Sequence, residues 1–356
     1  MTSEGGVAVV AGDRVLVTGG AGFIGSSLVR ELRRRGAHVV AMLEPGSDRA
    51  NLDHLDVEEV TADLRDADAV CKAADGCRLV FHVAALYRFW DPDPDAFYDI
   101  NVTGTQHVIE AARRSGCERL VYTSTVGTLG VHEASTGRPV DETSYAHIDH
   151  LFGSYKQSKY VAEHEVLRAA AQGLPAVLVQ PTMPVGPRDR GPTPTGRTVL
   201  EFLNGRFPGY VDTTLNIVDV EDVARGHVLA AERGSIGRSY ILGGENLQLR
   251  EVIGLLAEVT GQAAPTRQFP GKVALAAARV SELVEGRLLG REPTVPLEAA
   301  KMSTTHMSFD DSRARSELGY TSRPAREALE RAARWFVEAG YVRADRVAGI
   351  TRALQR

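Results

Sequence analysis

The chain has 356 residues, of which 43% are hydrophobic and 24% charged, and its formal net charge is −5. These values are ordinary for a globular protein that holds one large α/β domain and a smaller attached one. The small acidic excess argues against a nucleic-acid partner, and no apolar run is long enough to predict a membrane span. We find no secretory signal and no metal-like spacing among three cysteines, so we expect a cytoplasmic protein without a metal site.

Apolar runs typical of strands alternate with helical patterns through the first half of the chain. The runs predict strands at 14–18, 38–43, 57–61, 78–83, 119–123 and 176–180. The intervening patterns predict helices at 23–35, 66–74, 94–115 and 153–172. This alternation predicts an α/β fold with a doubly wound parallel sheet that helices cover on both faces.

The segment that joins the first strand to the first helix is rich in glycine. Thr18 to Gly25 reads T-G-G-A-G-F-I-G, so that Gly19, Gly22 and Gly25 recur every three residues. Glycine lets a backbone turn sharply and approach phosphates, and a helix N-terminus offers unpaired N–H groups and a positive dipole end. Because a strand precedes this loop and a helix follows it, a dinucleotide pyrophosphate site is favoured over a simple turn.

Two later motifs carry reactive side chains. Tyr155 and Lys159 are four residues apart and therefore share one face of a predicted helix. An ammonium beside a phenol favours the phenolate, so the tyrosine could exchange a proton near neutral pH. Ser124 and Thr125 directly follow the predicted strand at 119–123, where hydroxyls point into the crevice at the carboxyl edge of a sheet.

On these motifs the chain resembles the extended short-chain dehydrogenases/reductases, also called the NAD-dependent epimerase/dehydratase family. It is most similar to the hopanoid-associated sugar epimerase subfamily and similar to the dihydroflavonol reductases. Further matching segments are Asp63 in A-D-L-R-D, His82 to Ala85, Asn101, Gln180 to Pro187 and Val218 to Ala224. The resemblance implies that Asp63 holds the adenine amino group and that Asn101 heads the next helix. The resemblance covers the chain from about Arg14 to Phe336, and it implies a Rossmann-type fold with a smaller C-terminal substrate domain.

The resemblance also implies a catalytic set. Tyr155 would act as general base or acid on a substrate hydroxyl, and Lys159 would lower the pKa of that tyrosine and hold the nicotinamide ribose. Thr125 would hydrogen-bond the substrate oxygen, and Ser124 would support the site from the nicotinamide side. The implied cofactor-binding residues are Gly19, Gly22, Phe23, Ile24, Gly25, Glu44, Arg49, Asp63, Leu64, Ala84, Ala85, Lys159, Pro181 and Thr182.

The choice between NAD and NADP depends on the end of the second predicted strand. Glu44 lies there, and its carboxylate can accept a hydrogen bond from a ribose hydroxyl and would repel a 2′-phosphate. We therefore expect NAD. Arg49 lies close by in the sequence and could neutralise a phosphate, which keeps NADP open as the alternative.

The second half of the chain supplies the substrate side. Prolines and glycines at 181–197 predict an irregular segment that acts as a ligand lid. The candidate substrate-binding residues are Tyr87, Trp90, Met183, Arg190 and Arg197. We expect a flexible N-terminus at 1–13, a dinucleotide-binding domain at 14–180 to which 217–235 returns, a substrate domain at 181–216 and 236–340, and a tail without a core pattern at 341–356.

Three classes of function follow from this reading. The leading one is a sugar epimerase-like oxidoreductase that acts on a nucleotide-linked or similar hydroxylated substrate. The alternative is an NAD(P)H-dependent carbonyl reductase or alcohol dehydrogenase for a small hydrophobic substrate, as in dihydroflavonol reductases. A regulatory cofactor-binding protein is the third class, and the Tyr155/Lys159 pair argues against it because a binder needs no poised phenol. Family analogy implies a homodimer.

Overall fold

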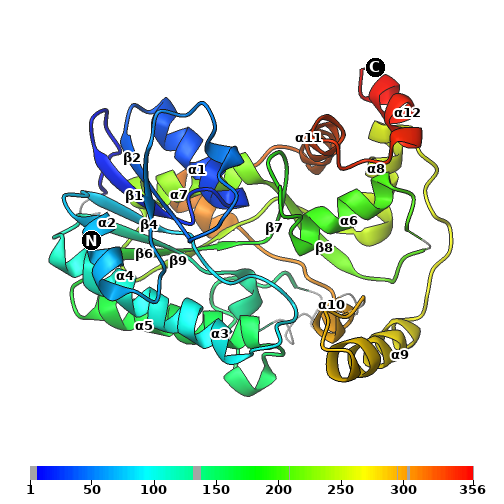
Figure 1. The fold of residues 1–356 in the computed structure, drawn as a ribbon, viewed down its shortest axis with the longest axis horizontal. Coiled ribbons are helices and arrows are strands. Elements are labelled where there is room, and N and C mark those ends of the chain that lie inside the picture. The colour runs from blue at the N-terminus through cyan, green and yellow to red at the C-terminus, as the bar shows by residue number, and fades with distance from the viewer. Residues whose placement is uncertain (1–5, 131–137, 208, 295, 303–304, 356) are drawn as a thin grey trace.

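A central parallel sheet organises the computed structural model, which describes residues 6–130, 138–207, 209–294, 296–302 and 305–355. Its strands are β1 Arg14–Thr18, β2 His38–Leu43, β3 Glu58–Thr61, β4 Leu79–His82, β5 Arg119–Thr123, β6 Ala176–Pro181 and β9 Ser239–Leu242. Their order in space is β3-β2-β1-β4-β5-β6-β9, and every pair is parallel (Figure 1). The first six strands have the order of a Rossmann fold, which confirms the predicted fold class.

Helices cover both faces of this sheet, as the alternation predicts. One face carries α1 Phe23–Arg34 and α7 Val220–Arg233, and the other carries α2 Ala67–Ala74, α4 Gly104–Arg114 and α5 Ser154–Ala171 (Figure 1). Val15 and Val17 of β1 are buried in the core beneath α1 and α7, whereas Leu16 between them is buried beneath α2, α4 and α5. Both faces of a strand are therefore apolar, which is why the first strands read as continuous hydrophobic runs.

The helix expected at 94–115 has three parts: α3 Asp95–Tyr98, a π-helical segment η2 Asp99–Thr103, and α4. Asn101 lies inside this run and does not head a helix. Its Oδ1 accepts from the N–H of Leu86 at 2.7 Å, and its Nδ2 donates to the Ser158 hydroxyl at 3.0 Å. These long-range contacts hold the wider turn, and the local sequence pattern does not contain them.

The rest of the chain forms a smaller layer beside the carboxyl edge of the main sheet. Its strands are β7 Met183–Val185, β8 Thr214–Asp219 and β10 Glu245–Gln248, in the order β10-β8-β7. Its helices are α6 Pro194–Leu203, α8 Leu249–Thr260, α9 Gly271–Ser281, α10 Leu297–Met302, α11 Ala325–Glu338 and α12 Ala344–Leu354. Short turns of 3₁₀ or π-helix are η1 Ala50–Leu52, η3 Val126–Thr128, η5 Ile148–His150, η6 Glu282–Leu288 and η7 Ala314–Leu318.

The proline-rich segment at 181–197 is more regular than predicted. Pro184 lies in β7, which is paired on one side only, with β8, so the missing N–H can face away from the ladder. Pro194 is the first residue of α6, where a helix N–H has no partner in any case, and Thr193 caps that helix by accepting from the Gly196 N–H at 3.2 Å. The expectation of an entirely irregular lid is therefore wrong.

Three predicted boundaries also change. β9 at 239–242 was expected within the substrate domain, but it pairs with β6 as the seventh strand of the main sheet. The N-terminal segment is anchored from Val7 onward, because its N–H donates to the Ala231 carbonyl at 3.3 Å and Val9 is buried. The tail forms α12, which packs against α8 and α11 through Ile350 and Leu354.

Within the part of the chain that the structure describes, no helix has both the length and the apolar character needed to cross a bilayer.

Candidate functional site

A cavity of about 1310 Å³ lies along the carboxyl edge of the main sheet. It brings together nearly all of the residues that the sequence singled out. Its lining includes Gly19, Gly22, Phe23, Ile24, Gly25, Glu44, Asp63, Leu64, Ala84, Ala85, Tyr87, Trp90, Ser124, Thr125, Tyr155, Lys159, Pro181, Thr182, Arg190 and Arg197. Two predicted residues, Arg49 and Met183, do not line it. Met183 lies in β7 and packs against the core of the smaller layer instead.

The glycine loop leaves room where a pyrophosphate would lie. A Cβ on Gly25 would lie 2.1 Å from the Gly19 carbonyl oxygen, and a Cβ on Gly19, whose φ is +66°, would lie 2.9 Å from the Ala84 Cα. A Cβ on Gly22 would meet only the Gly19 oxygen, at 3.2 Å. Among the described residues no side chain caps α1, so its N-terminal N–H groups face the cavity uncapped. This cradle fits a dinucleotide pyrophosphate.

The end of the cavity beside β2 is acidic. Glu44 is exposed there. Asp48 forms an ion pair with Arg190 at 2.7 Å, so the segment at 181–197 contacts the loop after β2 at this end of the cavity. Arg49 pairs instead with Glu59 of β3 at 2.5 Å, which turns the one predicted 2′-phosphate ligand away from the site.

Asp63, which the family resemblance places against the adenine, lies in the cavity wall. Its carboxylate accepts three hydrogen bonds from the Arg65 side chain, at 2.6–3.1 Å, and one from the Arg65 N–H at 2.8 Å. These contacts lower the pKa of Asp63. The carboxylate is therefore anionic at neutral pH, and Arg65 occupies both of its oxygens.

Tyr155 faces the cavity beside a second tyrosine. The ring centroids of Tyr155 and Tyr87 are 4.7 Å apart, at an interplanar angle of 45°. Burial raises the pKa of Tyr155 well above its usual value, the neighbouring Tyr87 raises it further, and a hydrogen bond with Thr125 opposes them. Lys159 is not among the groups that shift this pKa in the protein without a cofactor, so the lowering of the Tyr155 pKa by Lys159 stays a prediction for the cofactor-bound site.

The Lys159 side chain is buried beneath the site. Its Nζ donates to the Thr123 carbonyl oxygen at 2.7 Å and lies 4.3 Å from the centroid of the Tyr122 ring. Burial lowers the pKa of Lys159 to about 7, and the charge of Glu163 opposes that shift. Lys159 therefore loses its proton more readily than an exposed lysine does.

Glu163 is a site residue that the sequence reading missed. Its Oε2 accepts hydrogen bonds from the hydroxyls of Ser124 and Thr128, and Gln180 Nε2 donates to its Oε1 at 3.3 Å. The carboxylate is buried one helical turn after Lys159 on α5. The available signal was this i, i+4 spacing from Lys159. The contacts hold the Ser124 hydroxyl and place a negative charge near the Lys159 ammonium.

The buried His82 supports the cofactor-side wall. Its Nδ1 is 2.8 Å from the Thr18 hydroxyl and its Nε2 is 3.0 Å from the Thr105 hydroxyl. Burial lowers the pKa of His82 to about 3, so the ring stays neutral. Thr18 Oγ1 in turn accepts from the N–H groups of Val83 and Ala84 at 3.1 Å, which fixes the strand end beside the glycine loop.

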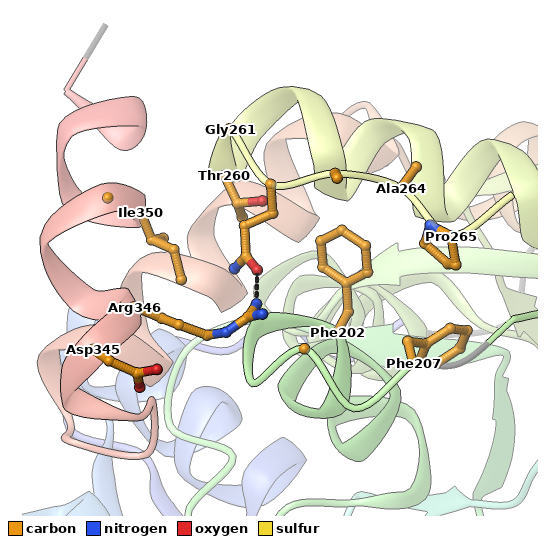
Figure 2. A pocket seen from close by; sticks show the side chains of 13 residues that line it. Phe202, Phe207, Thr260, Gly261, Ala264, Pro265, Asp345, Arg346 and Ile350 are labelled. Atoms are coloured by element: carbon orange, nitrogen blue, oxygen red, sulfur yellow. Dashed lines mark hydrogen bonds between the residues drawn. The ribbon is translucent and has the colours of Figure 1, made fainter.

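A second cavity, of about 600 Å³, lies between the end of α6, the end of α8 and α12 (Figure 2). Phe202, Phe207 and Ile350 point into it, and Arg346 crosses it to bond the Gln262 amide (Figure 2). Phe207 also lines the main cavity. No residue that the sequence predicted for the site lies here, and the guanidinium of Arg346 is already bonded within the protein.

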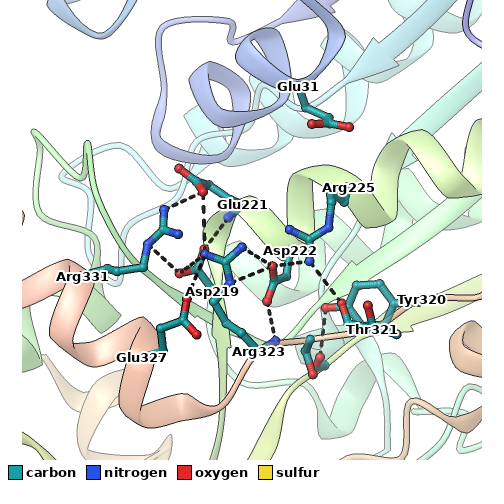
Figure 3. A network of polar contacts seen from close by, with 12 residues as sticks. Glu31, Asp219, Glu221, Asp222, Arg225, Tyr320, Thr321, Arg323, Glu327 and Arg331 are labelled. Carbon is teal, nitrogen blue, oxygen red and sulfur yellow. Dashed lines mark hydrogen bonds and ion pairs between the residues drawn. The ribbon is translucent and has the colours of Figure 1, made fainter. Parts of the chain in front are cut away.

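A partly buried ionic network connects α7 to α11 and to the chain just before α11 (Figure 3). Arg323 Nε and Nη2 lie 3.0 and 2.8 Å from Asp222 Oδ1, and Arg331 pairs with Glu221 at 2.5 Å. Glu221 also pairs with Arg188 at 2.8 Å, and Arg188 lines the main cavity. The network therefore joins the C-terminal helices to the wall of the candidate site.

Comparison with known proteins agrees with this geometry. The chain matches the family model "NAD dependent epimerase/dehydratase family" over residues 15–243. It is 43% identical over 339 residues to a Synechocystis sp. protein whose provisional name is dihydroflavonol 4-reductase, covering 94% of this chain and 98% of that protein. It is 33% identical over 334 residues to sterol demethylase protein B of Methylococcus capsulatus, covering 92% and 99% respectively.

A solved structure extends the comparison to the fold. The crystal structure of gox2253 has 44% sequence identity and a TM-score of 0.82, and the match covers 93% of this chain and all of that one. The family resemblance that the sequence motifs predicted is thereby confirmed. The chain belongs to the NAD-dependent epimerase/dehydratase family of extended short-chain dehydrogenases/reductases, which makes it an oxidoreductase-type enzyme.

Proposed function

We propose that the protein is an NAD-dependent oxidoreductase that interconverts a secondary alcohol and a ketone on a hydrophobic substrate. The observation that carries the proposal is the contact of Tyr155 with the Tyr87 ring, at the end of a cavity whose other end is the glycine cradle. Phe89 and Trp90 line the same end. The names of the two relatives, a reductase and a sterol demethylase protein, support an alcohol or ketone on an apolar skeleton.

Bound NAD⁺ would supply the hydride acceptor and a positive ring charge that favours the phenolate. Tyr155 takes the hydroxyl proton of the alcohol as the C–H hydride leaves, and it returns that proton to the oxygen in the reverse reaction. Thr125, which hydrogen-bonds Tyr155, orients the same oxygen. Lys159 holds the nicotinamide ribose, and Ser124, bonded to Glu163, supports the ring side of the site.

NAD would lie along the wall already described. The pyrophosphate would meet Gly22, Phe23, Ile24 and the uncapped end of α1, and the adenine end would meet Glu44, Asp63 and Leu64. Ala84, Ala85, Pro181 and Thr182 would border the ribose and nicotinamide, and Tyr87 and Trp90 the substrate. A homodimer stays a prediction.

A sugar epimerase-like reaction is the second candidate. The family description favours it, and Arg190 and Arg197 line the cavity, where they could meet an anionic nucleotide. Both guanidinium groups are engaged, however, by Asp48 at 2.7 Å and by Glu292 at 3.5 Å. These pairs weaken the case for a nucleotide-linked substrate and favour the first candidate.

The deciding experiment measures NADH formation from NAD⁺ with a panel of hydrophobic secondary alcohols and, separately, with hexose nucleotides. Net NADH formation with the alcohols supports the proposal. Epimerisation of a hexose nucleotide by tightly retained NAD, without net NADH, would establish the second candidate instead.

The cofactor preference yields a direct test. The protein should bind NAD more tightly than NADP, and Glu44→Arg should shift the ratio of the two Kd values toward NADP by about tenfold or more. The reason is that Glu44 faces the cavity and repels a 2′-phosphate, whereas arginine would pair with it. Calorimetric titration of both nucleotides measures the ratio.

Glu59→Gln is the matched control for this test. It frees Arg49 from its ion pair with Glu59 but leaves the cavity wall unchanged, so the preference should stay with NAD. A shift toward NADP in Glu59→Gln, or tighter NADP binding by the unmodified protein, would mean that Arg49 reaches the ribose.

The buried carboxylate behind Lys159 predicts a change in pH dependence. Glu163→Gln keeps an acceptor for Ser124 but removes the charge that opposes the lowering of the Lys159 pKa. The ammonium would then be lost at lower pH, so the alkaline limb of kcat/KM should move to lower pH. Glu165→Gln, which removes an ion pair with Arg168 on the same helix and leaves the Ser124–Glu163 contact in place, is the control. An unchanged profile in Glu163→Gln would assign Glu163 a purely structural role.

A further inference from the structure

Exposed large hydrophobic side chains are concentrated in one short segment. Among the described residues, half of all such side chains lie on α9, on η6 or directly after it: Val273, Val280, Leu283, Val284, Leu288 and Leu289, each 42–73% exposed. We call these six residues the α9 stripe. Val273, Val280 and Val284 are seven and four residues apart, which places them on one side of a helical run. Scattered apolar residues are normal on a surface, but a contiguous row is typical of an interaction site.

The α9 stripe borders the substrate end of the main cavity. A Cβ on Gly286, within the same helical run, would lie 3.3 Å from Nε1 of Trp90, which lines that cavity. Thr294 lines it as well, and its N–H donates to Glu285 of η6 at 2.6 Å. The helical run of α9 and η6 therefore carries the α9 stripe on its exposed side and contacts Trp90 of the cavity wall on its other side.

The charges around the α9 stripe are suited to an anionic partner. Lys272 and Arg279 are exposed on α9, and no ion pair to either is found in the part of the chain that the structure describes. The two carboxylates of η6 are engaged or enclosed: Glu285 bonds Ser281 and Arg291, and Glu282 is half-buried. An apolar row flanked by cations is the pattern of a helix that lies in a membrane interface. α9 also lies at the outer edge of the smaller layer, beside α10 (Figure 1).

We propose that the α9 stripe docks on an anionic lipid surface, so that a hydrophobic substrate enters the cavity directly from the bilayer. The proposal rests on the proposed function for its substrate class. A second copy of the chain is the competing occupant, but stacking two stripes would bring Lys272 and Arg279 of both copies together without acidic partners. An anionic bilayer buries the apolar row at its acyl boundary, and its headgroups pair with the cations.

The test is co-sedimentation of the full chain with vesicles of phosphatidylcholine and phosphatidylglycerol. We expect binding to the mixed vesicles and at least about tenfold weaker binding of the variant Val280→Gln/Leu283→Gln. Lys272→Glu/Arg279→Glu should lose the preference for phosphatidylglycerol over pure phosphatidylcholine. Ile236→Gln changes an equally exposed residue outside the stripe and should bind like the unmodified protein.

Three outcomes overturn the docking proposal. The first is equal vesicle binding by the stripe variant and the unmodified protein, and the second is no vesicle binding by either. The third is a concentration-dependent dimer in sedimentation velocity that the stripe variant abolishes, which would assign the surface to a second copy. Turnover of a water-soluble secondary alcohol should be unchanged in the stripe variant. If the unmodified protein binds vesicles but turns over none of the secondary alcohols, that result contradicts the proposed function and leaves the docking proposal standing.

Discussion

Tyr155→Phe should lower kcat by about 10²- to 10⁴-fold, the range that a positioned proton-transfer group supplies, and leave NAD affinity nearly unchanged. The substitution removes one hydroxyl and keeps the ring that contacts Tyr87. The variant then has no phenol oxygen to take the proton of the substrate hydroxyl as the hydride leaves. Steady-state kinetics with the best alcohol of the panel, together with calorimetric titration of NAD, measure both quantities.

Tyr160→Phe is the matched control, because Tyr160 lies on the same helix and its ring contacts His164 rather than the cavity. It should retain normal turnover. If Tyr155→Phe turns over at a rate near that of the unmodified protein, Tyr155 is not the proton-transfer group, and another group must handle the proton. If Tyr155→Phe loses NAD affinity as well, its effect is structural.

Gly22→Val should weaken NAD binding by about tenfold or more, which is about 1.4 kcal/mol, with little loss of fold stability. The backbone at Gly22 has φ −68°, which any residue adopts, and a Cβ there meets only the Gly19 oxygen at 3.2 Å. The added side chain would instead occupy the space above the loop, where the pyrophosphate would lie. Calorimetry measures the Kd, and thermal unfolding measures stability.

The neighbouring Gly25→Ala provides the contrast, because its new Cβ would lie 2.1 Å from the Gly19 oxygen, so helix and loop would have to separate. This variant should lose about 1–3 kcal/mol of folding free energy, the usual cost of overpacking. Normal NAD affinity in a folded Gly22→Val protein would mean that the loop is only a turn. Equal destabilisation by both substitutions would mean that Gly22, like Gly25, is required for packing of the loop against the helix.

Much of the site could be predicted because its signals are local. Gly19, Gly22 and Gly25 follow β1 directly, and Tyr155 and Lys159 share one turn of α5, so spacing alone placed each group on the correct element. Ser124 could be placed in the same way, at the end of β5. Because the strands are parallel, their carboxyl ends all lie at the same edge of the main sheet.

Other assignments failed because they depend on residues far apart in the chain. Arg49 is adjacent to the cofactor strand in sequence, but an ion pair with Glu59 on the neighbouring strand turns it away. Val347, Ile350 and Leu354 do recur at helical spacing in the tail, yet an eleven-residue helix with two arginines is convincing only once α8 and α11 cover it.

The sequence by itself determined the α/β class, the dinucleotide loop and the Tyr155/Lys159 pair, since each follows from backbone geometry within a few residues. Only the tertiary structure decided that β9 completes the main sheet, because a four-residue strand pairs with β6 across nearly sixty intervening residues that carry no pattern for it. It also decided that burial raises the pKa of Tyr155 and lowers that of Lys159 to about 7. A pKa depends on the water and charge around a group in three dimensions, and spacing along a helix specifies neither.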